Sequence, residues 1–296
     1  MSFEILRNME SFTQNMFNGI IGFQEKDHPA WKNDLSFQDK IKNIPLHYLM
    51  FSNADRDPKT HGPTIAHYYP LKFEMAKIAD FIKQVSDAPV VCDVHARNGF
   101  IGSLLALEMA NNHTTDTNKV VGLQDPEEKP NQIESFYDEN NYEMKTGSLS
   151  NIDLDIDVVF SSWMPAGQNI TDAIIAKNPK LVVYVFTEHT NQFSGERQTG
   201  TNDAFGEQLP EQYKLLEEWS LTRPKDLLHE VWPDLTGNLE ETRLVRIYAN
   251  EGFHDIHSSL EEKNISGYDW EQDLQMAETA LRAKEEMKNR GFPAQF

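Results

Sequence analysis

Short apolar runs, separated by stretches with helical periodicity, dominate the middle of the chain. Six of them are short enough for strands and are rich in β-branched or aromatic residues: 89–94, 119–124, 156–161, 181–186, 219–221 and 243–248. The last run alternates apolar and polar positions, as an antiparallel strand with one exposed face does. Apolar residues recur at helical spacing at 71–85, 100–109 and 170–177. Strands that alternate with helices predict an α/β fold with a central, mostly parallel sheet.

Helical patterns also lie towards both ends of the chain. The N-terminal part has helix-like segments at 3–20 and 71–85, separated by a loop-like, proline-bearing stretch at 51–70. An amphipathic segment, 268–290, is followed by Gly291 and Pro293, which are typical of a helix end. We therefore expect an N-terminal helical and loop cap (1–88), an α/β domain (89–250) and a C-terminal tail (251–296). Its helix, 268–290, packs on the domain or binds a protein partner.

Composition and charge narrow the class of protein. With 296 residues, of which 39% are hydrophobic, the chain can bury a full core. A formal net charge of −20 repels phosphate backbones, so a nucleic-acid partner is not expected. Apolar runs stay well below the roughly 20 residues of a membrane span, and the N-terminus has no apolar signal core. The single cysteine, Cys92, allows no internal disulfide, and we expect an inert buried thiol in a cytoplasmic protein.

One stretch looks built to hold a small molecule. Residues 89–106 read PVVCDVHARNGFIGSLLA, a buried strand, a sharp turn and the start of a helix. In such units the turn backbone and the helix N-terminus form a polar cradle outside the carboxyl ends of the strands. Side chains, however, stand in this turn where glycines are expected, because only glycine lets a ligand approach without a Cβ in the way.

The turn from Asp93 to Gly102 resembles the cofactor-binding turn of class I S-adenosylmethionine-dependent methyltransferases. In that family an acidic residue ends the first strand and alternating glycines follow it. The resemblance implies a Rossmann-like sheet of seven strands flanked by helices and S-adenosyl-L-methionine as the cofactor. It also implies that Asp93 holds the cofactor's amino group. Gly99 matches the last of the three glycines, while His95 and Arg97 occupy the first two positions.

Further segments follow in the family's order. The resemblance implies that Asp125, after the second strand, accepts hydrogen bonds from the ribose hydroxyls. It places Ser148, in the turn Thr146-Gly147-Ser148, near the adenine, where the family often has an acid. The segment 157–165 resembles the strand that delivers residues towards the methyl group, with Ser161 and Trp163 near the cofactor. A nicotinamide-binding turn is the competing interpretation, since Gly99 and Gly102 match half of a GxGxxG pattern.

Several of these residues have a structural alternative. Asp93 either contacts the cofactor or caps the following helix, and Asp125 either binds ribose or ends a turn. His95 and Arg97 either fill the space that glycines leave open or create a new site in which Arg97 holds a carboxylate or phosphate. Because an isolated buried guanidinium is costly, we predict that Arg97 points into the cleft, pairs with Asp93 or Asp125 and blocks the methionine site.

The sequence offers only weak catalytic candidates. His189 follows the strand 181–186 and could act as a general base, and Tyr69 belongs to a cluster with His61, His67 and Tyr68 that could form a lid. The pair His254 and His257 lacks a third metal ligand, so no metal site is expected. Ser161 and Ser162 lack the turn of a hydrolase nucleophile. Two functions remain open: a methyltransferase acting on a small molecule or a protein side chain, and a catalytically inactive relative that binds a partner.

Overall fold

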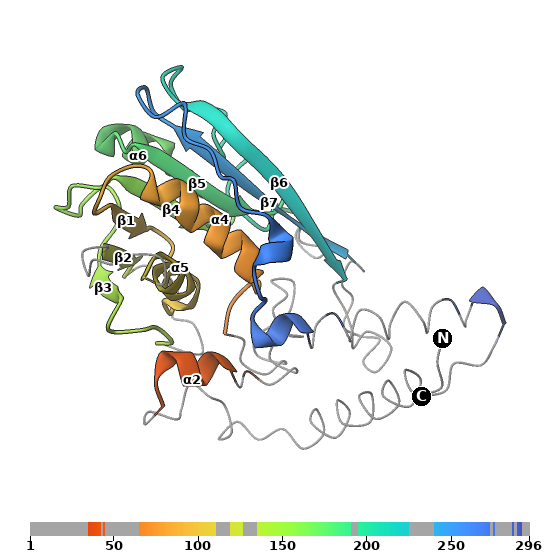
Figure 1. Cartoon of the computed structure of the whole chain (residues 1–296). Coiled ribbons are helices and arrows are strands. Elements are labelled where there is room, and N and C mark those ends of the chain that lie inside the picture. Colours follow the sequence, from red (N-terminus) through yellow and green to blue (C-terminus); the bar gives the residue numbers. More distant parts are fainter. Residues whose placement is uncertain are drawn as a thin grey trace.

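A single seven-stranded sheet forms the centre of the protein (Figure 1). The computed structural model describes residues 35–42, 44, 65–110, 119–126, 135–190, 195–224, 240–272, 275, 286 and 289–291. The strand order is β3-β2-β1-β4-β5-β7-β6. Their bounds are β1 Val90–Asp93, β2 Lys119–Gln124, β3 Tyr142–Thr146, β4 Val158–Ser162, β5 Leu181–Phe186, β6 Lys214–Pro224 and β7 Glu240–Ala249.

Five strands are parallel, and β7 is antiparallel to both of its neighbours. The strands β3, β2, β1, β4 and β5 pair in parallel, with Asp93 of β1 opposite Gly122 of β2 and Phe160 of β4. Strand β7 lies between β5 and β6 and runs against both. The expected mostly parallel sheet of seven strands is confirmed, and so is the antiparallel direction of the strand predicted at 243–248.

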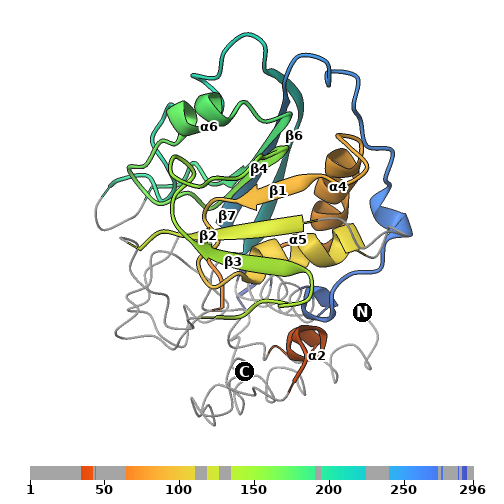
Figure 2. The ribbon, with the colours of Figure 1, turned by 90° about the vertical axis from the view of Figure 1, so that its left-hand side faces the viewer.

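Helices cover both faces of this sheet. Helices α4 (Lys72–Lys83) and α5 (Phe100–Ala110) lie on one face, and the short helix α6 (Thr171–Lys177) lies on the other (Figures 1 and 2). Helix α2 (Phe37–Lys42) and the 3₁₀ helix Glu262–Asn264 complete the described helices. The predicted helices at 71–85, 100–109 and 170–177 are confirmed to within two residues at each end.

Alternation along the buried strands divides the core into two layers. Val158 and Phe160 of β4 face α4 and α5, whereas Val159 between them faces α6. In β5 all six residues, LVVYVF, are buried, as expected for a strand covered on both faces. The larger layer includes Phe37 of α2 and Trp270 near the C-terminus. Segments from both ends of the chain therefore pack on the α4 and α5 side of the sheet.

Two strands differ from the hydrophobic pattern. Strand β3, with the sequence YEMKT, was not among the six runs, because only Tyr142 of its five residues is buried. It is an edge strand, and its polar residues face solvent. Strand β6 extends over eleven residues instead of the three predicted at 219–221, because its pairing with β7 continues beyond the apolar centre.

Only part of the expected terminal helices falls within the described residues. The segment 3–20 lies outside them, and so do most positions of 268–290. Within the described part of 268–290, residues 269–272 form a helical turn. This first turn is attached to the domain. Trp270 Nε1 donates to the carbonyl of Pro70 at 3.3 Å, and Glu271 accepts from the Lys72 amide at 2.6 Å. Tyr268 donates its hydroxyl to Glu108 of α5 at 3.0 Å.

None of the helices in the described part of the chain is both long enough and apolar enough to cross a lipid bilayer.

Candidate functional site

The carboxyl ends of β1, β2 and β4 meet at one edge of the sheet. The turn 94–99 leaves β1 there and leads into α5. Its backbone is attached to both neighbouring strands, since the Val94 amide donates to Phe160 O at 3.0 Å and the Ala96 amide to Leu123 O at 3.3 Å. Ligands of parallel α/β sheets bind at this kind of edge, so the turn is the candidate site.

Asn98 and Gly99 shape the end of this turn. Asn98 Oδ1 accepts from the Phe100 amide at 3.2 Å, which satisfies an amide in the first turn of α5, and Asn98 Nδ2 donates to Ile65 O at 2.7 Å. Gly99 has φ of +84°, and a Cβ there would lie 2.7 Å from Cβ of Tyr137. The last glycine of the motif is thus required by both conformation and space. Asn98 was not singled out from the sequence. Its place just before the predicted helix, where asparagine often caps, is the signal that could have identified it.

Asp93, expected to contact a cofactor, is buried under α5. Its Oδ2 accepts a hydrogen bond from the Tyr142 hydroxyl at 2.8 Å. Tyr142 reaches Asp93 from β3 across Gly122 of β2, and Gly102 of α5 leaves room for both side chains. A Cβ at either glycine would overlap Tyr142. Burial, followed by the Asp93 charge, raises the pKa of Tyr142 well above its usual value, so Tyr142 is the hydrogen-bond donor.

We expect Gly122→Ala to lower the free energy of unfolding by about 1–3 kcal/mol, the range for overpacked core positions. The added methyl overlaps the Tyr142 ring, and Ala96 Cβ lies 2.8 Å away on another side. Urea unfolding of Gly122→Ala, Tyr142→Ala and the double variant measures this contact. The double variant should be more stable than the sum of the two single effects predicts. Additive effects would show that Tyr142 does not cross over Gly122.

Arg97 and Trp163 face each other from the turns after β1 and β4. Arg97 Nη2 donates to the carbonyl of Trp163 at 3.3 Å. Both residues have positive φ, +50° and +57°, in a region that bulky side chains rarely adopt. The third such residue among those described, Asn178, ends α6 in an ordinary left-handed cap. Backbone strain of this kind is characteristic of functional sites.

Arg97 thus points across the edge from β1 towards β4. The acceptor of Arg97 Nη2 is a main-chain carbonyl, and Asp93 Oδ2 is bonded to Tyr142. The expected pairing of Arg97 with Asp93 or Asp125 stays a prediction.

Aromatic side chains pack around Trp163. His67 stacks on its ring with centroids 6.4 Å apart, and Tyr68 does so at 5.2 Å. The Tyr68 hydroxyl shares a hydrogen bond of 2.9 Å with Ser162 Oγ at the end of β4. His67 and Tyr68, two members of the suggested lid cluster, therefore lie at the site; His61 lies outside the described residues.

A buried ion pair lies behind this aromatic group. Arg243 of β7 binds Glu74 of α4 through Nε at 3.1 Å and Nη2 at 2.5 Å, and both side chains are about 95% buried. The Arg243 guanidinium also lies over the Tyr68 ring at 4.9 Å. The pair joins α4 to β7 and holds Tyr68 against Ser162. Neither residue was singled out from the sequence, because charges so far apart in the chain show no pairing pattern.

Three buried polar atoms at this edge have no hydrogen-bond partner among the described residues. They are His95 Nε2, Ser161 Oγ and Trp163 Nε1. All three residues are less than 10% exposed. Buried polar groups are nearly always hydrogen-bonded in native proteins, since an unsatisfied one costs about 1–3 kcal/mol. Donors and acceptors left unsatisfied at one edge of a sheet are what a polar ligand would satisfy.

His95 should make the protein less stable as the pH falls. Burial, and then the charge of Arg97, lower the pKa of the folded-state imidazole to about 3. The unfolded chain takes up the proton near pH 6.5 and the folded chain does not. The stabilising contribution is therefore complete above pH 6.5 and decreases as the pH falls towards 3. Between pH 7 and 5.5 the loss from His95 should be about 1 kcal/mol.

Urea unfolding at both pH values measures this loss. His95→Asn should abolish it, and His257→Asn, at an exposed histidine, is the matched control. An equal change of the pH dependence in both variants would contradict the burial of a neutral His95.

Asp125 and Ser148 occupy neighbouring turns at the same edge. Asp125 follows β2 directly and is half-buried. The Gly147 amide donates to Gln124 O at 3.0 Å, which brings the turn after β3 beside Asp125. Ser148, also half-buried, follows Gly147. The order of these two residues along the edge agrees with the roles that the resemblance implies for them, and those roles stay predictions.

The two weak catalytic candidates occupy structural positions. His189 Nε2 accepts from the Thr242 amide at 3.0 Å, which joins the end of β5 to β7. Tyr69 is 1% exposed and packs edge-on against Phe100 and Trp270. An imidazole nitrogen that accepts from the backbone has no lone pair left for a substrate proton. Neither geometry favours a general base.

Side chains that could bind a metal or act as a nucleophile do not gather at one place in the described part of the chain. No group of three or more His, Cys, Asp or Glu side chains there is arranged to hold a metal. His254 and His257 contact the carbonyls of Gln212 and Asp255. Cys92 is buried in β1, and burial raises its thiol pKa to about 12.

Comparisons with known proteins give weak similarities. No family model matches the chain, and no curated protein does. Among solved structures, a magnesium protoporphyrin IX methyltransferase from Synechocystis, with S-adenosylhomocysteine bound, has 11% identity and a TM-score of 0.37. The match covers 61% of this chain and 83% of that one. A 1,6-didemethyltoxoflavin N1-methyltransferase from Burkholderia thailandensis has 11% identity and a TM-score of 0.36, covering 61% and 78%.

The order and the directions of the strands identify the fold. A dinucleotide-binding sheet has the order 3-2-1-4-5-6. Here an antiparallel β7 is inserted between β5 and β6, and the turn after β1 ends in a required glycine. The protein therefore has a Rossmann-like α/β fold with one antiparallel strand inserted in the sheet.

Proposed function

We propose that this protein binds S-adenosylmethionine at the carboxyl edge of β1, β2 and β4 and transfers its methyl group to a small molecule or a protein side chain. The observation that carries the proposal is the group of three unsatisfied buried polar atoms, on His95, Ser161 and Trp163, beside the β1 turn. They lie where the fold places a ligand, and no described side chain satisfies them.

The residues present fit the nucleoside half of the cofactor. Asp125 would accept hydrogen bonds from the ribose hydroxyls, and Ser148 would lie near the adenine. Gly99 keeps the turn free of a Cβ, although Tyr137 stands against it. The methionine half meets Arg97, whose guanidinium lies between the β1 and β4 turns. We infer that Arg97 leaves the Trp163 carbonyl when the cofactor binds, and that this lowers the affinity.

When bound, the cofactor would supply an electrophilic methyl group on a sulfonium. The chain's part is positioning and exclusion of water. Trp163, with His67 and Tyr68 packed against its ring, belongs to an aromatic group that favours a cation. The Tyr142 hydroxyl holds Asp93 as an oriented carboxylate below the turn. We assign no general base, because His189 and Tyr69 are engaged in structural contacts.

Isothermal titration calorimetry with S-adenosylhomocysteine tests the proposal. We expect saturable binding that Asp125→Ala weakens about tenfold or more, the loss of a charge-assisted hydrogen-bond acceptor. Asp172→Ala, an exposed acidic residue in the first turn of α6, is the matched control and should bind as the wild type does. The absence of heat at millimolar ligand, from protein that unfolds cooperatively, would remove the enzymatic proposal.

One observation favours a second function. Arg97 and His95 replace two glycines, and Arg97 joins the β1 turn to the β4 turn directly. If this contact is permanent, the site is closed, and the protein is an inactive relative that serves as a binding module. The segment 268–290 would then be the first candidate for a partner-binding surface.

A further inference from the structure

A second candidate site lies beyond β4 and β5, in the segment 195–207. This segment is attached to the ends of both strands. Thr199 Oγ1 donates to Thr187 O at 2.6 Å and accepts from the Thr187 amide at 3.2 Å. The Gly200 amide donates to Met164 O at 3.1 Å, next to Trp163. Arg197, two residues before Thr199, pairs with Thr190 in an antiparallel bridge. The segment therefore has a fixed position at the carboxyl edge.

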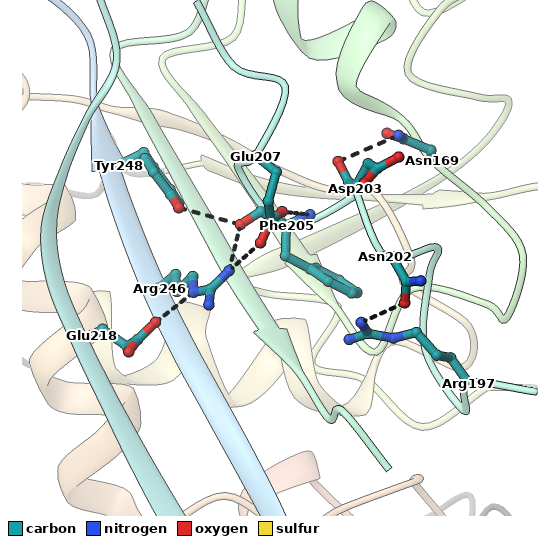
Figure 3. Close-up of polar contacts among 9 residues, drawn as sticks. All are labelled: Asn169, Arg197, Asn202, Asp203, Phe205, Glu207, Glu218, Arg246 and Tyr248. Carbon is teal, nitrogen blue, oxygen red and sulfur yellow. Dashed lines mark hydrogen bonds and ion pairs between the residues drawn. The ribbon is translucent and has the colours of Figure 1, made fainter. Parts of the chain in front are cut away.

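Arg197 lies at one end of a stack of four side chains. Its guanidinium lies over the Phe205 ring at 5.5 Å, and Phe205 stacks on Phe186 with centroids 3.9 Å apart and planes 7° apart. Arg246 lies over the Phe186 ring at 5.1 Å. Two stacked rings with a cation on each hold both guanidiniums in defined planes. Figure 3 shows Arg197 and Arg246 with Phe205 between them.

The two arginines differ in their hydrogen bonds. Arg246 donates Nε to Glu218 at 2.5 Å and Nη1 to Glu207 at 2.7 Å (Figure 3). Arg197 donates Nη1 to the Asn202 amide oxygen at 3.1 Å. Its Nε and Nη2 are shielded from solvent and have no acceptor among the described residues. No described carboxylate lies within ion-pair distance of Arg197, so its charge is not neutralised within that part of the chain.

The unsatisfied nitrogens are the pair that binds a carboxylate side-on. Nε and Nη2 lie along one edge of the guanidinium and donate in parallel. The same protein shows this edge occupied elsewhere: Arg243 donates through Nε and Nη2 to the two oxygens of Glu74. The Arg197 edge is equivalent to the Arg243 edge without its carboxylate. Leaving charged donors buried without an acceptor is costly, and a ligand oxyanion would remove that cost.

We propose that the Nε and Nη2 edge of Arg197 binds the carboxylate of a small-molecule ligand at the carboxyl edge of β4 and β5. Taken together with the proposed methyl transfer, on which this step rests, the methyl acceptor is a carboxylate-bearing small molecule. A net charge of −20 gives the protein no general attraction for anions. Recognition of an acidic ligand must therefore come from a local, fixed cation such as Arg197.

Two-dimensional NMR of the arginine Nε–H groups tests the site directly, with sodium benzoate and sodium acetate as probes. The Arg197 signal, assigned by its loss in Arg197→Lys, should shift saturably with either carboxylate. The Arg246 signal, whose Nε is bonded to Glu218, is the internal control and should not move. Arg197→Lys retains the charge but loses the two-donor edge, so calorimetry should show that benzoate binds at least about tenfold more weakly to it than to the wild type.

The result separates this inference from the proposed function. No Arg197 shift up to about 50 mM benzoate, a concentration at which even a site with a millimolar Kd is saturated, would overturn the inference even if S-adenosylhomocysteine binds. An equal shift with sodium chloride would overturn it too. Tighter binding of inorganic phosphate than of benzoate would overturn the assignment of a carboxylate ligand. A benzoate shift without any binding of S-adenosylhomocysteine would support the anion site and refute the methyl-transfer proposal.

Discussion

Replacement of Arg243 by methionine is expected to lower the free energy of unfolding by about 3–5 kcal/mol, the usual effect of leaving one buried charge unpaired. Glu74 would keep its carboxylate in the core without the two hydrogen bonds that Arg243 supplies. Tyr68 would lose the cation that lies over its ring at 4.9 Å. Urea unfolding followed by circular dichroism measures the change.

Two variants serve as controls for this prediction. Arg246→Met removes a partly exposed arginine that also binds two glutamates, Glu207 and Glu218, and it should cost distinctly less. The double variant Glu74→Met, Arg243→Met should recover most of the stability, because no charge is then left buried. A loss below about 1 kcal/mol in Arg243→Met, the range of exposed pairs, would show that the pair is solvated and does not support the site.

The double substitution His95→Gly, Arg97→Gly is expected to increase the affinity for S-adenosylmethionine by about tenfold, if the cofactor must displace one hydrogen bond in the wild type. Glycine adopts positive φ without strain, so position 97 can keep its conformation while the side chain leaves the edge. Removal of the His95 side chain clears the other of the two positions at which the methyltransferase motif has glycine. Calorimetry measures both affinities.

Asn178→Gly is the matched control for this experiment. It replaces a non-glycine residue that also has positive φ, but at the end of α6 and away from the site. Its affinity should equal that of the wild type. Unchanged binding in the double variant, with cooperative unfolding retained, would show that the two side chains are no obstacle.

The sheet could be predicted because its central strands are buried on both faces. Runs such as LVVYVF at Leu181–Phe186 are apolar throughout, and their alternation with helices specifies a parallel order. Strand β3 could not be predicted in this way, because an edge strand exposes most of its side chains and carries no apolar run. Its key residue, Tyr142, contributes through a long-range contact with Asp93 that local patterns do not contain.

The site was predictable in position and less so in contacts. The β1 turn lies at the carboxyl edge of the sheet, as its residues predict, and Arg97 reaches across to the β4 turn. Its acceptor, a main-chain carbonyl, could not be foreseen, because carbonyl positions depend on how two distant turns meet. The aromatic group at Trp163 likewise joins residues about 95 positions apart in sequence, a range in which only tertiary packing sets contacts. The stack that holds Arg197 extends through Phe186 of β5 to Arg246 of β7, and local patterns do not contain that arrangement either.

Hydrogen–deuterium exchange with and without saturating S-adenosylhomocysteine tests the central claim most directly, because it locates the ligand as well as detecting it. Binding at the proposed site should slow exchange in the β1 turn and the start of α5 (94–103), in the β4 turn (161–165) and around Asp125. The strand pair β6 and β7 should be unaffected. Protection confined to other segments, or no change at millimolar ligand, would contradict a cofactor site at this edge of the sheet.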